Sequence, residues 1–169
     1  MNQPEPTGAV RIGPGGPEIA INRVIDRPIE EVWSFLTESE LLARWYGTWS
    51  GDPAEGVIQL FMVEAPDIPG ECQIKRCERP RILDLIITNP EDEAWNLEVV
   101  LDRAGDQTHL MFRQPLEGVA ADAGDIGPGW EYYLDRLTAA VHGRSISDID
   151  FSCYHPRQVQ HYQRAPEEN

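Results

Sequence analysis

The side chains that most often carry out enzymatic chemistry do not fall into a catalytic spacing in this sequence. There is no Gly-x-Ser-x-Gly turn for a nucleophile, no glycine-rich loop of the kind that binds phosphate, and no pair of histidines on one helical face. His109 alternates with Leu110 and Phe112 in a strand-like segment, which predicts that it faces solvent. His142 comes near the end of a helical segment, where an imidazole complements the helix dipole. The sequence therefore names no catalytic residue; whether the protein is an enzyme stays open, and we lean towards no.

The sulfur and imidazole side chains also lack the spacing of a metal site. The three cysteines are Cys72, Cys77 and Cys153, and neither they nor the four histidines are separated as zinc ligands usually are. Cys72 and Cys77 lie five residues apart in one strand-like segment, so a regular strand would point them to opposite faces and prevent a disulfide. We expect reduced thiols, no metal and no cofactor.

The charge balance excludes two classes of partner. The chain of 169 residues carries 29 acidic and 14 basic side chains, a net charge of −15. Nucleic acids and anionic membrane surfaces both require a basic surface, so we expect neither as a partner. No apolar run approaches the roughly 20 residues of a membrane-spanning helix, and residues 1–17 lack the apolar core of a signal peptide. The expected location is the cytoplasm.

The apolar periodicity predicts one strand, two short helices, a series of strands and a long helix. Residues 18–25 alternate as a half-buried strand does, Pro28 suits the first turn of a helix, and Ser39 can cap a second helix that Gly47 ends. Five strand-like segments follow, with turn-forming residues between them: 57–64, 70–77, 82–88, 95–102 and 107–113. Connections this short predict antiparallel neighbours.

The longest helical pattern covers residues 129–143. Trp130, Tyr133, Leu134, Leu137 and Val141 recur at helical spacing and form one apolar stripe, which we expect to pack on the sheet. The glycines and proline at 127–129 mark its predicted start. The preceding segment, residues 114–129, is rich in Gly, Asp and Ala, and we interpret it as a mobile loop that could act as a lid.

Two stretches resemble a known superfamily. The sequence INRVIDRPIEEVWSFLTESELLARWYG, which begins at Ile21, resembles the opening of START-like (SRPBCC) domains, with a Pro after the first strand, a Val-Trp pair in the first helix and a Trp closing the second. The Gly-Trp opening and Leu-Asp-Arg-Leu run of the long helix match the closing helix of that superfamily. Within it, the chain is most similar to the branch related to the activator of the heat-shock-protein-90 ATPase.

The resemblance implies an α+β helix-grip fold. We expect a curved antiparallel sheet of about six to seven strands around the long C-terminal helix, with two short helices after the first strand. The predicted organisation is a disordered leader at residues 1–16, which hold four glycines and three prolines, the START-like domain at 17–143, and a partly ordered tail at 144–169.

The resemblance also implies a cavity between the closing helix and the sheet. The residues that we expect to line it are aromatic or aliphatic: Trp33, Trp45, Phe61, Trp95, Phe112, Trp130, Tyr133 and Leu137. For any single one of them, simple core packing is the stronger expectation. Polar candidates on otherwise apolar faces are Arg23, Arg76 and Asp84, each interpreted first as a rim or cross-strand partner and only second as a catalyst.

Three functions of different class follow. The leading hypothesis is a binding or carrier domain for an apolar, aromatic or lipid-like small molecule. The first alternative is a protein-interaction module of the co-chaperone type, with an acidic surface and an exposed tail that contact a protein partner. The second alternative is a cyclase-like or hydrolase-like enzyme. A homodimer is compatible with all three.

Overall fold

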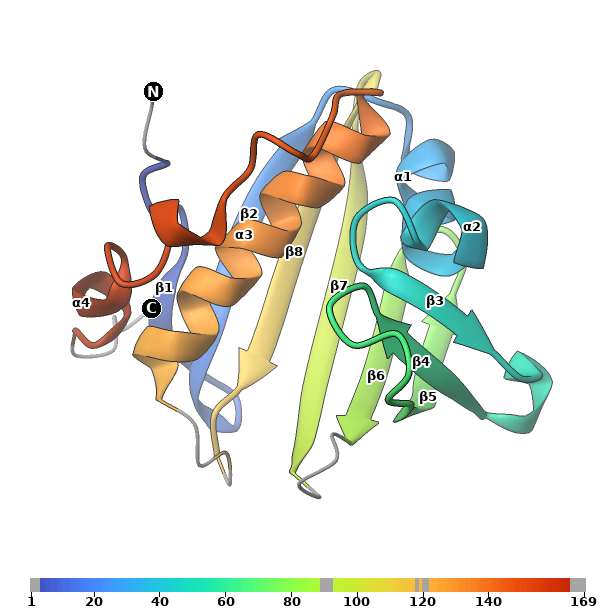
Figure 1. Cartoon of the computed structure of the whole chain (residues 1–169), viewed down its shortest axis with the longest axis horizontal. Coiled ribbons are helices and arrows are strands. Elements are labelled where there is room, and N and C mark those ends of the chain that lie inside the picture. Colours follow the sequence, from blue (N-terminus) through green and yellow to red (C-terminus); the bar gives the residue numbers. More distant parts are fainter. Residues whose placement is uncertain (1–3, 89–92, 118, 120–121, 165–169) are drawn as a thin grey trace.

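The strand-like segments and the turns between them fold into one continuous antiparallel sheet. In the computed structural model, which describes residues 4–88, 93–117, 119 and 122–164, eight strands lie in the order β1-β2-β8-β7-β6-β5-β4-β3 (Figure 1). The strands are β1 (Ala9–Gly13), β2 (Gly16–Ile25), β3 (Gly47–Ser50), β4 (Val57–Met62), β5 (Gly70–Glu78), β6 (Ile82–Thr88), β7 (Ala94–Ala104) and β8 (Gln107–Pro115). The first three residues of the predicted leader, residues 118, 120 and 121 of the predicted lid, and the last five residues of the tail lie outside the described residues.

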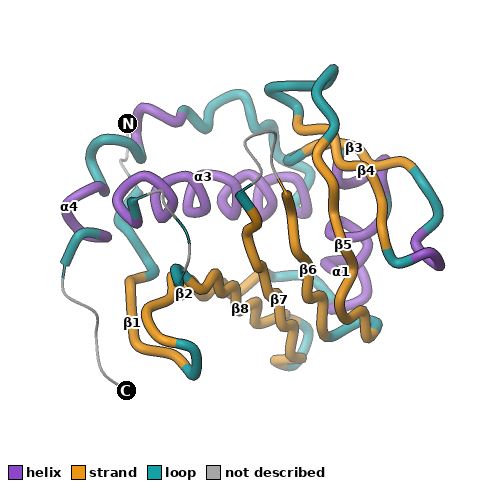
Figure 2. Tube along the Cα trace, turned by 90° about the horizontal axis from the view of Figure 1, so that it is seen from below, coloured by secondary structure: helices purple, strands orange, loops and turns teal. Residues whose placement is uncertain are grey.

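A long helix lies along one side of this sheet. The helices are α1 (Ile29–Thr37), α2 (Ser39–Leu42), α3 (Ala123–Val141) and α4 (Val159–Tyr162), with 3-10 turns at Pro53–Glu55 and Phe151–Cys153. Figure 2 shows α3 running above β2, β8 and β7, while β3 and β4 rise to its level at one end. The predicted α+β helix-grip fold is confirmed, although the sheet has eight strands where six to seven were expected.

One of the additional strands, β1, falls in the predicted leader. Ala9–Gly13 pairs antiparallel with β2, and Val10 is buried. The expectation of disorder is therefore wrong for this segment. Residues 1–16 as a whole hold few apolar residues, but a neighbouring strand supplies β1 with hydrogen-bond partners that composition does not reveal.

The long helix begins six residues before its predicted start. Asp122 caps it by accepting a hydrogen bond from Gly124 N at 2.6 Å, and the helix then continues through Gly127 and Pro128. Gly127 has a packing role, because a Cβ at this position would lie 2.3 Å from the ring of Tyr162 in α4. The mobile loop predicted at 114–129 is therefore wrong for most of its length, since β8 reaches Pro115 and α3 begins at Ala123.

The predicted cap of the second helix is also wrong. Glu38 occupies the N-cap of α2, and Ser39 is the first helical residue. The Ser39 hydroxyl instead accepts a hydrogen bond from Trp49 N at 3.1 Å and lies 3.3 Å from Trp49 O. This contact fixes α2 against β3, the second strand that the sequence pattern did not reveal.

A buried carboxylate on α3 joins the N-terminal segment, the sheet and the tail. Glu131 is 1% exposed. It accepts hydrogen bonds from Thr7 N and Oγ1, each at 2.7 Å, from Gly8 N at 3.1 Å, from Arg23 Nη2 at 2.8 Å and from Tyr162 Oη at 2.5 Å. Tyr162 belongs to the hydrophobic core, so the tail packs on the domain through α4, beside α3 and β1 (Figure 1).

The hydrogen bonds around Glu131 determine its protonation. Burial alone raises the pKa of this carboxyl, but the hydrogen bonds from Tyr162 and Arg23 and the positive charge of Arg23 outweigh burial, so the pKa lies below the ordinary value of 4.5. A folded-state pKa below the unfolded value gives stability that is present above pH 4.5. That stability is lost as the pH falls through the lower folded value.

We expect Glu131→Gln to lower the free energy of unfolding by about 3–5 kcal/mol at neutral pH, because it removes the buried charge partner of Arg23 and leaves only the more exposed Asp135 to pair with it. Urea denaturation measures this loss, and the difference in unfolding free energy between variant and wild type should become smaller as the pH falls below 4.5. Glu71→Gln, at an exposed position on β5, is the control and should cost less than about 0.5 kcal/mol. A difference in unfolding free energy that stays constant below pH 4.5 would contradict the lowered pKa of Glu131.

Candidate functional site

The space between α3 and the concave face of the sheet contains an apolar pocket, called here the inner pocket. Its volume is about 180 Å³, and its walls come from α1, α2, α3 and the strands β3 to β8. Alternate residues of the strands supply the walls, such as Leu83 and Leu85 of β6, Leu97 and Val99 of β7, and Phe112 of β8. Among the described residues, the lining contains no Asp, Glu, Lys, Arg or His. Such a pocket favours an apolar occupant.

Three tryptophans in the inner pocket turn their polar atoms away from it. Trp45 and Trp49 donate their indole N–H groups to carbonyl oxygens in the last turns of α1, at 2.8 and 2.9 Å. Trp130 donates to Gln114 Oε1 at 2.7 Å. With each indole nitrogen already bonded elsewhere, the rings offer carbon faces to the pocket.

A β-bulge brings two cysteines to the same pocket. The register of β5 against β6 shifts between Ile74 and Arg76, and Cys72, Ile74 and Cys77 all line the inner pocket. The expectation that Cys72 and Cys77 face opposite sides is therefore wrong, since the extra residue of a bulge changes the alternation. Both are free thiols, and burial raises the pKa of Cys72 to about 11.

A second, larger pocket opens beside the first, called here the outer pocket. It measures about 540 Å³ and shares Tyr46, Ile87 and Trp130 with the inner pocket, so the two meet at these side chains. Half of its lining residues are aromatic: Tyr46, Trp95, Trp130, Tyr132, Tyr133 and Phe151. The outer pocket therefore offers ring faces for stacking.

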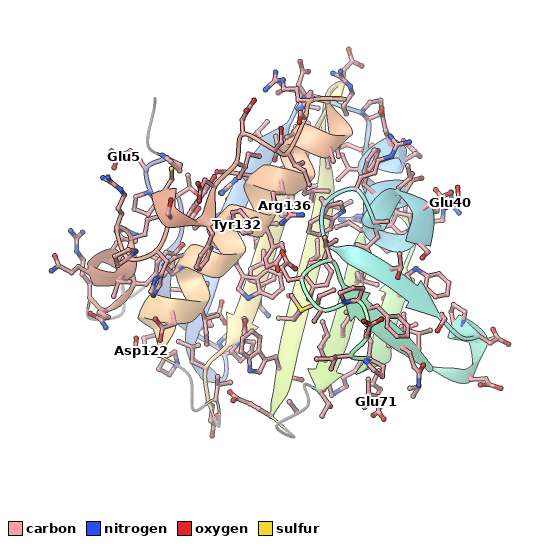
Figure 3. All side chains as sticks on the ribbon, viewed as in Figure 1. Glu5, Glu40, Glu71, Asp122, Tyr132 and Arg136 are labelled. Carbon is pink, nitrogen blue, oxygen red and sulfur yellow. The ribbon has the colours of Figure 1, made fainter. Side chains whose placement is uncertain are left out.

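The charged side chains at the outer pocket are paired within the protein. Glu64 accepts hydrogen bonds from Tyr133 Oη at 2.9 Å and from Arg136 Nη1 at 3.1 Å. Arg136 also donates to Tyr132 Oη at 2.8 Å from one turn further along α3 (Figure 3) and lies over the Tyr132 ring, 5.1 Å from its centroid. These contacts hold the aromatic wall of the outer pocket in place.

Tyr46 lies where the two pockets meet, and its hydroxyl has no hydrogen-bond partner among the described residues. Tyr46 is 8% exposed and stacks parallel to Trp130, with ring centroids 6.2 Å apart, and lies against Tyr133 with centroids 5.0 Å apart. No described residue makes a hydrogen bond to its hydroxyl, and this oxygen is not among the fully enclosed unpaired atoms of the described residues. Burial, with smaller contributions from Cys72 and Glu64, raises the pKa of Tyr46, so the hydroxyl stays protonated at neutral pH.

The residues expected to line the cavity divide into three groups. Trp45, Phe112 and Trp130 line the inner pocket, and Trp95, Tyr133 and again Trp130 line the outer one. Trp33, Phe61 and Leu137 line neither. Phe61 lies between the pocket residues Leu60 and Met62 and so faces the other side of β4, while Trp33 and Leu137 are buried in the surrounding core.

Sequence reasoning missed the junction residue. Tyr46 directly follows Trp45, at the end of the second helical segment, where helical periodicity no longer assigns a face. The only available signal was its place in an aromatic pair before Gly47.

The polar candidates lie away from both pockets. Arg23 is held by Glu131 and by Asp135 at 3.1 Å. Arg76 and Asp84 face each other across β5 and β6, on the side opposite to Leu83 and Leu85. They are ion-pair and cross-strand residues, as their first interpretation held.

The described residues contain no group of three or more His, Cys, Asp or Glu side chains placed to hold a metal ion. No helix within the described segments has the length and apolar character needed to cross a membrane.

The fold and the helix-covered pocket define a START-like domain of the helix-grip type. The chain belongs to the family described as Activator of Hsp90 ATPase homolog 1-like protein, whose model matches residues 26–142. None of the curated proteins compared with the chain matches it.

Several solved structures share this fold. The crystal structure of CalU16 from Micromonospora echinospora is 25% identical, covers 91% of this chain and 92% of its own, and superposes with a TM-score of 0.67. A conserved protein of unknown function from Enterococcus faecalis is 21% identical, with 92% and 88% covered and a TM-score of 0.69. A Bordetella parapertussis protein, at 23% identity, covers 99% and 97% with a TM-score of 0.68.

The position of Cys72 in the wall of the inner pocket predicts that its thiol reacts slowly. Since its pKa is raised from 9.0 to about 11, the thiolate fraction at neutral pH falls to about one hundredth of that of an ordinary thiol. The double variant Cys77→Ser/Cys153→Ser keeps Cys72 as its single cysteine. We expect this thiol to react with a disulfide reagent about 100-fold more slowly in the native than in the denatured protein. The variant Cys72→Ser/Cys153→Ser keeps the exposed Cys77 and should react faster. Equal rates for the two variants would contradict the burial of Cys72.

Proposed function

We propose that the protein binds a mostly apolar, uncharged small molecule in the inner pocket, with part of the ligand reaching the outer pocket. The observation that carries this proposal is the lining of the inner pocket, which has no charged side chain among the described residues. A cavity of about 150 Å³ accepts a single aromatic ring in other proteins, so 180 Å³ suits one or two fused rings or a short branched chain. The outer pocket, at about 540 Å³, lies within the range typical of ligand sites.

The charges around the pockets favour a neutral ligand over an anion. The carboxylates at the outer pocket belong to Glu64 and Asp125, and the whole chain carries −15. An anionic head group, such as that of a fatty acid, would meet like charges there and lose its hydration without a free cation to replace it. Affinity would then come from apolar burial, at about 25 cal/mol per Å² removed from water.

Binding without chemical transformation fits this site better than catalysis. The titratable groups that line the inner pocket are Tyr46, Cys72 and Cys77, and burial raises the pKa of each of them. A general base or a nucleophile needs a pKa lowered towards neutrality or an adjacent base. A cyclase-like enzyme remains the alternative that the family supports, and the co-chaperone type of interaction module rests on the family description alone.

The direct test uses Prodan (6-propionyl-2-dimethylaminonaphthalene), a neutral dye whose emission shifts to the blue in apolar surroundings. We expect a saturable blue shift, together with energy transfer from Trp45, Trp49 and Trp130, which line the pocket. Leu97→Trp fills the inner pocket and should weaken binding at least about tenfold, a change of about 1.4 kcal/mol.

Val57→Trp is the matched control, because Val57 is 42% exposed and lines neither pocket. It should leave the affinity within about twofold, and thermal melts check that both variants fold. Leu85→Phe, a smaller increase at another wall position, replaces Leu97→Trp if that variant does not fold. A wild-type protein that gives no saturable shift would overturn the proposed function.

A further inference from the structure

We infer that the Tyr46 hydroxyl is the hydrogen-bond donor that selects the ligand, and that the ligand carries an uncharged oxygen acceptor, such as a ketone, next to its apolar ring system. This inference rests on the proposed function and names the class of ligand. The acceptor would lie at the junction of the two pockets, with an apolar group in the inner pocket and a planar group among the rings of the outer pocket.

The position of Tyr46 supports this role. It lines both pockets, and its ring is held on three sides by Trp45, Trp130 and Tyr133, with centroid separations of 5.5, 6.2 and 5.0 Å. A ring fixed in this way presents its hydroxyl in one direction, so a ligand that uses it does not have to order a mobile side chain.

The hydroxyl differs from the indole N–H groups of the inner pocket and from the hydroxyl of Tyr133 in having no hydrogen-bond partner among the described residues. The indole N–H groups of Trp45, Trp49 and Trp130 are bonded to protein oxygens, and Tyr133 Oη donates to Glu64. Tyr46 Oη has no partner among the described residues, although the side chain is more than nine-tenths buried. Because this oxygen is not fully enclosed, a ligand acceptor in the pocket can reach it and take the place of water there.

The surroundings determine which partner the hydroxyl can take. Burial and the nearby Cys72 and Glu64 raise the pKa of Tyr46, so the proton stays on the oxygen and the group is available as a donor. Glu64, being an anion, also disfavours a negatively charged acceptor at the same place. A neutral carbonyl oxygen satisfies the donor without introducing a second negative charge.

The experiment compares two ligands that differ mainly in the acceptor. 2-Acetylnaphthalene carries a ketone, and 2-ethylnaphthalene has a similar shape without one. Displacement of Prodan gives the affinity of each for the wild type and for Tyr46→Phe. We expect the ratio of ketone to hydrocarbon affinity to fall about tenfold in Tyr46→Phe, the value of one hydrogen bond of about 1.4 kcal/mol.

Tyr154→Phe is the matched control, because it removes a buried tyrosine hydroxyl that is bonded to Asp135 and lines neither pocket. It should leave the affinity ratio within about twofold. Infrared spectra add a readout that a purely structural role would not change: the carbonyl band of bound 2-acetylnaphthalene should lie at the lower frequency of a hydrogen-bonded ketone in the wild type and move upward in Tyr46→Phe.

Each outcome has a separate meaning. If Tyr46→Phe weakens both ligands equally, or if Tyr154→Phe changes the ratio as much, the inference about Tyr46 is overturned while the proposed function stands. If neither ligand displaces Prodan and the dye itself does not bind, the proposed function fails. If Tyr46→Phe does not fold, the carbonyl frequency of 2-acetylnaphthalene bound to the wild type tests the inference. A frequency equal to that of the same ketone in an apolar solvent overturns it.

Discussion

The buried carboxylate of Glu131 determines how the long helix is held, and the pocket depends on it. Glu131 ties α3 to the β1–β2 end of the sheet, through Thr7 and Gly8 of the N-terminal segment, Arg23 of β2 and Tyr162 of the tail. A helix whose position depended only on packing its apolar stripe would pack onto the sheet until no space remained. Because polar contacts hold α3 at this end of the sheet, room can remain beneath Trp130 and Leu134, over the strands β3 to β8.

This arrangement also explains the glycines of α3. Gly124 and Gly127 lie one turn apart, and a Cβ at either position would come within 2.9 Å of α4. They weaken the helix in isolation but allow the tail to approach closely enough for Tyr162 to reach Glu131. The tail and the N-terminal segment are thus parts of the support that keeps the pocket open, and the pocket is a property of the whole chain.

The sequence predicted the architecture correctly where a local pattern of apolar residues determines which face of an element is buried. The alternation of Leu97, Val99 and Leu101 assigned the inner face of β7, and the stripe from Trp130 to Val141 assigned the inner face of α3. Both patterns reflect burial, which is the strongest signal in a sequence.

The predictions that were wrong concern segments whose structure depends on contacts with residues distant in the sequence. Composition alone gives no sign that β2 would order Ala9–Gly13, that α4 would require Gly127, or that a bulge after Ile74 would turn Cys77 towards the same pocket as Cys72. The candidate site was predicted in part for the same reason. Trp45, Phe112 and Trp130 were expected from their aromatic side chains and from the cavity that the START-like resemblance implies, whereas Tyr46 acquires its role from three rings that meet only in the folded chain.

The central claim is that the space under α3 is a ligand site. Intermolecular nuclear Overhauser effects test it most directly, measured between bound 2-acetylnaphthalene and the methyl groups of the protein. The account predicts contacts to Leu85, Leu97 and Val99, which line the inner pocket, and none to the exposed Val24 and Val57. Contacts confined to exposed methyl groups, or none at all at saturating ligand, would contradict it.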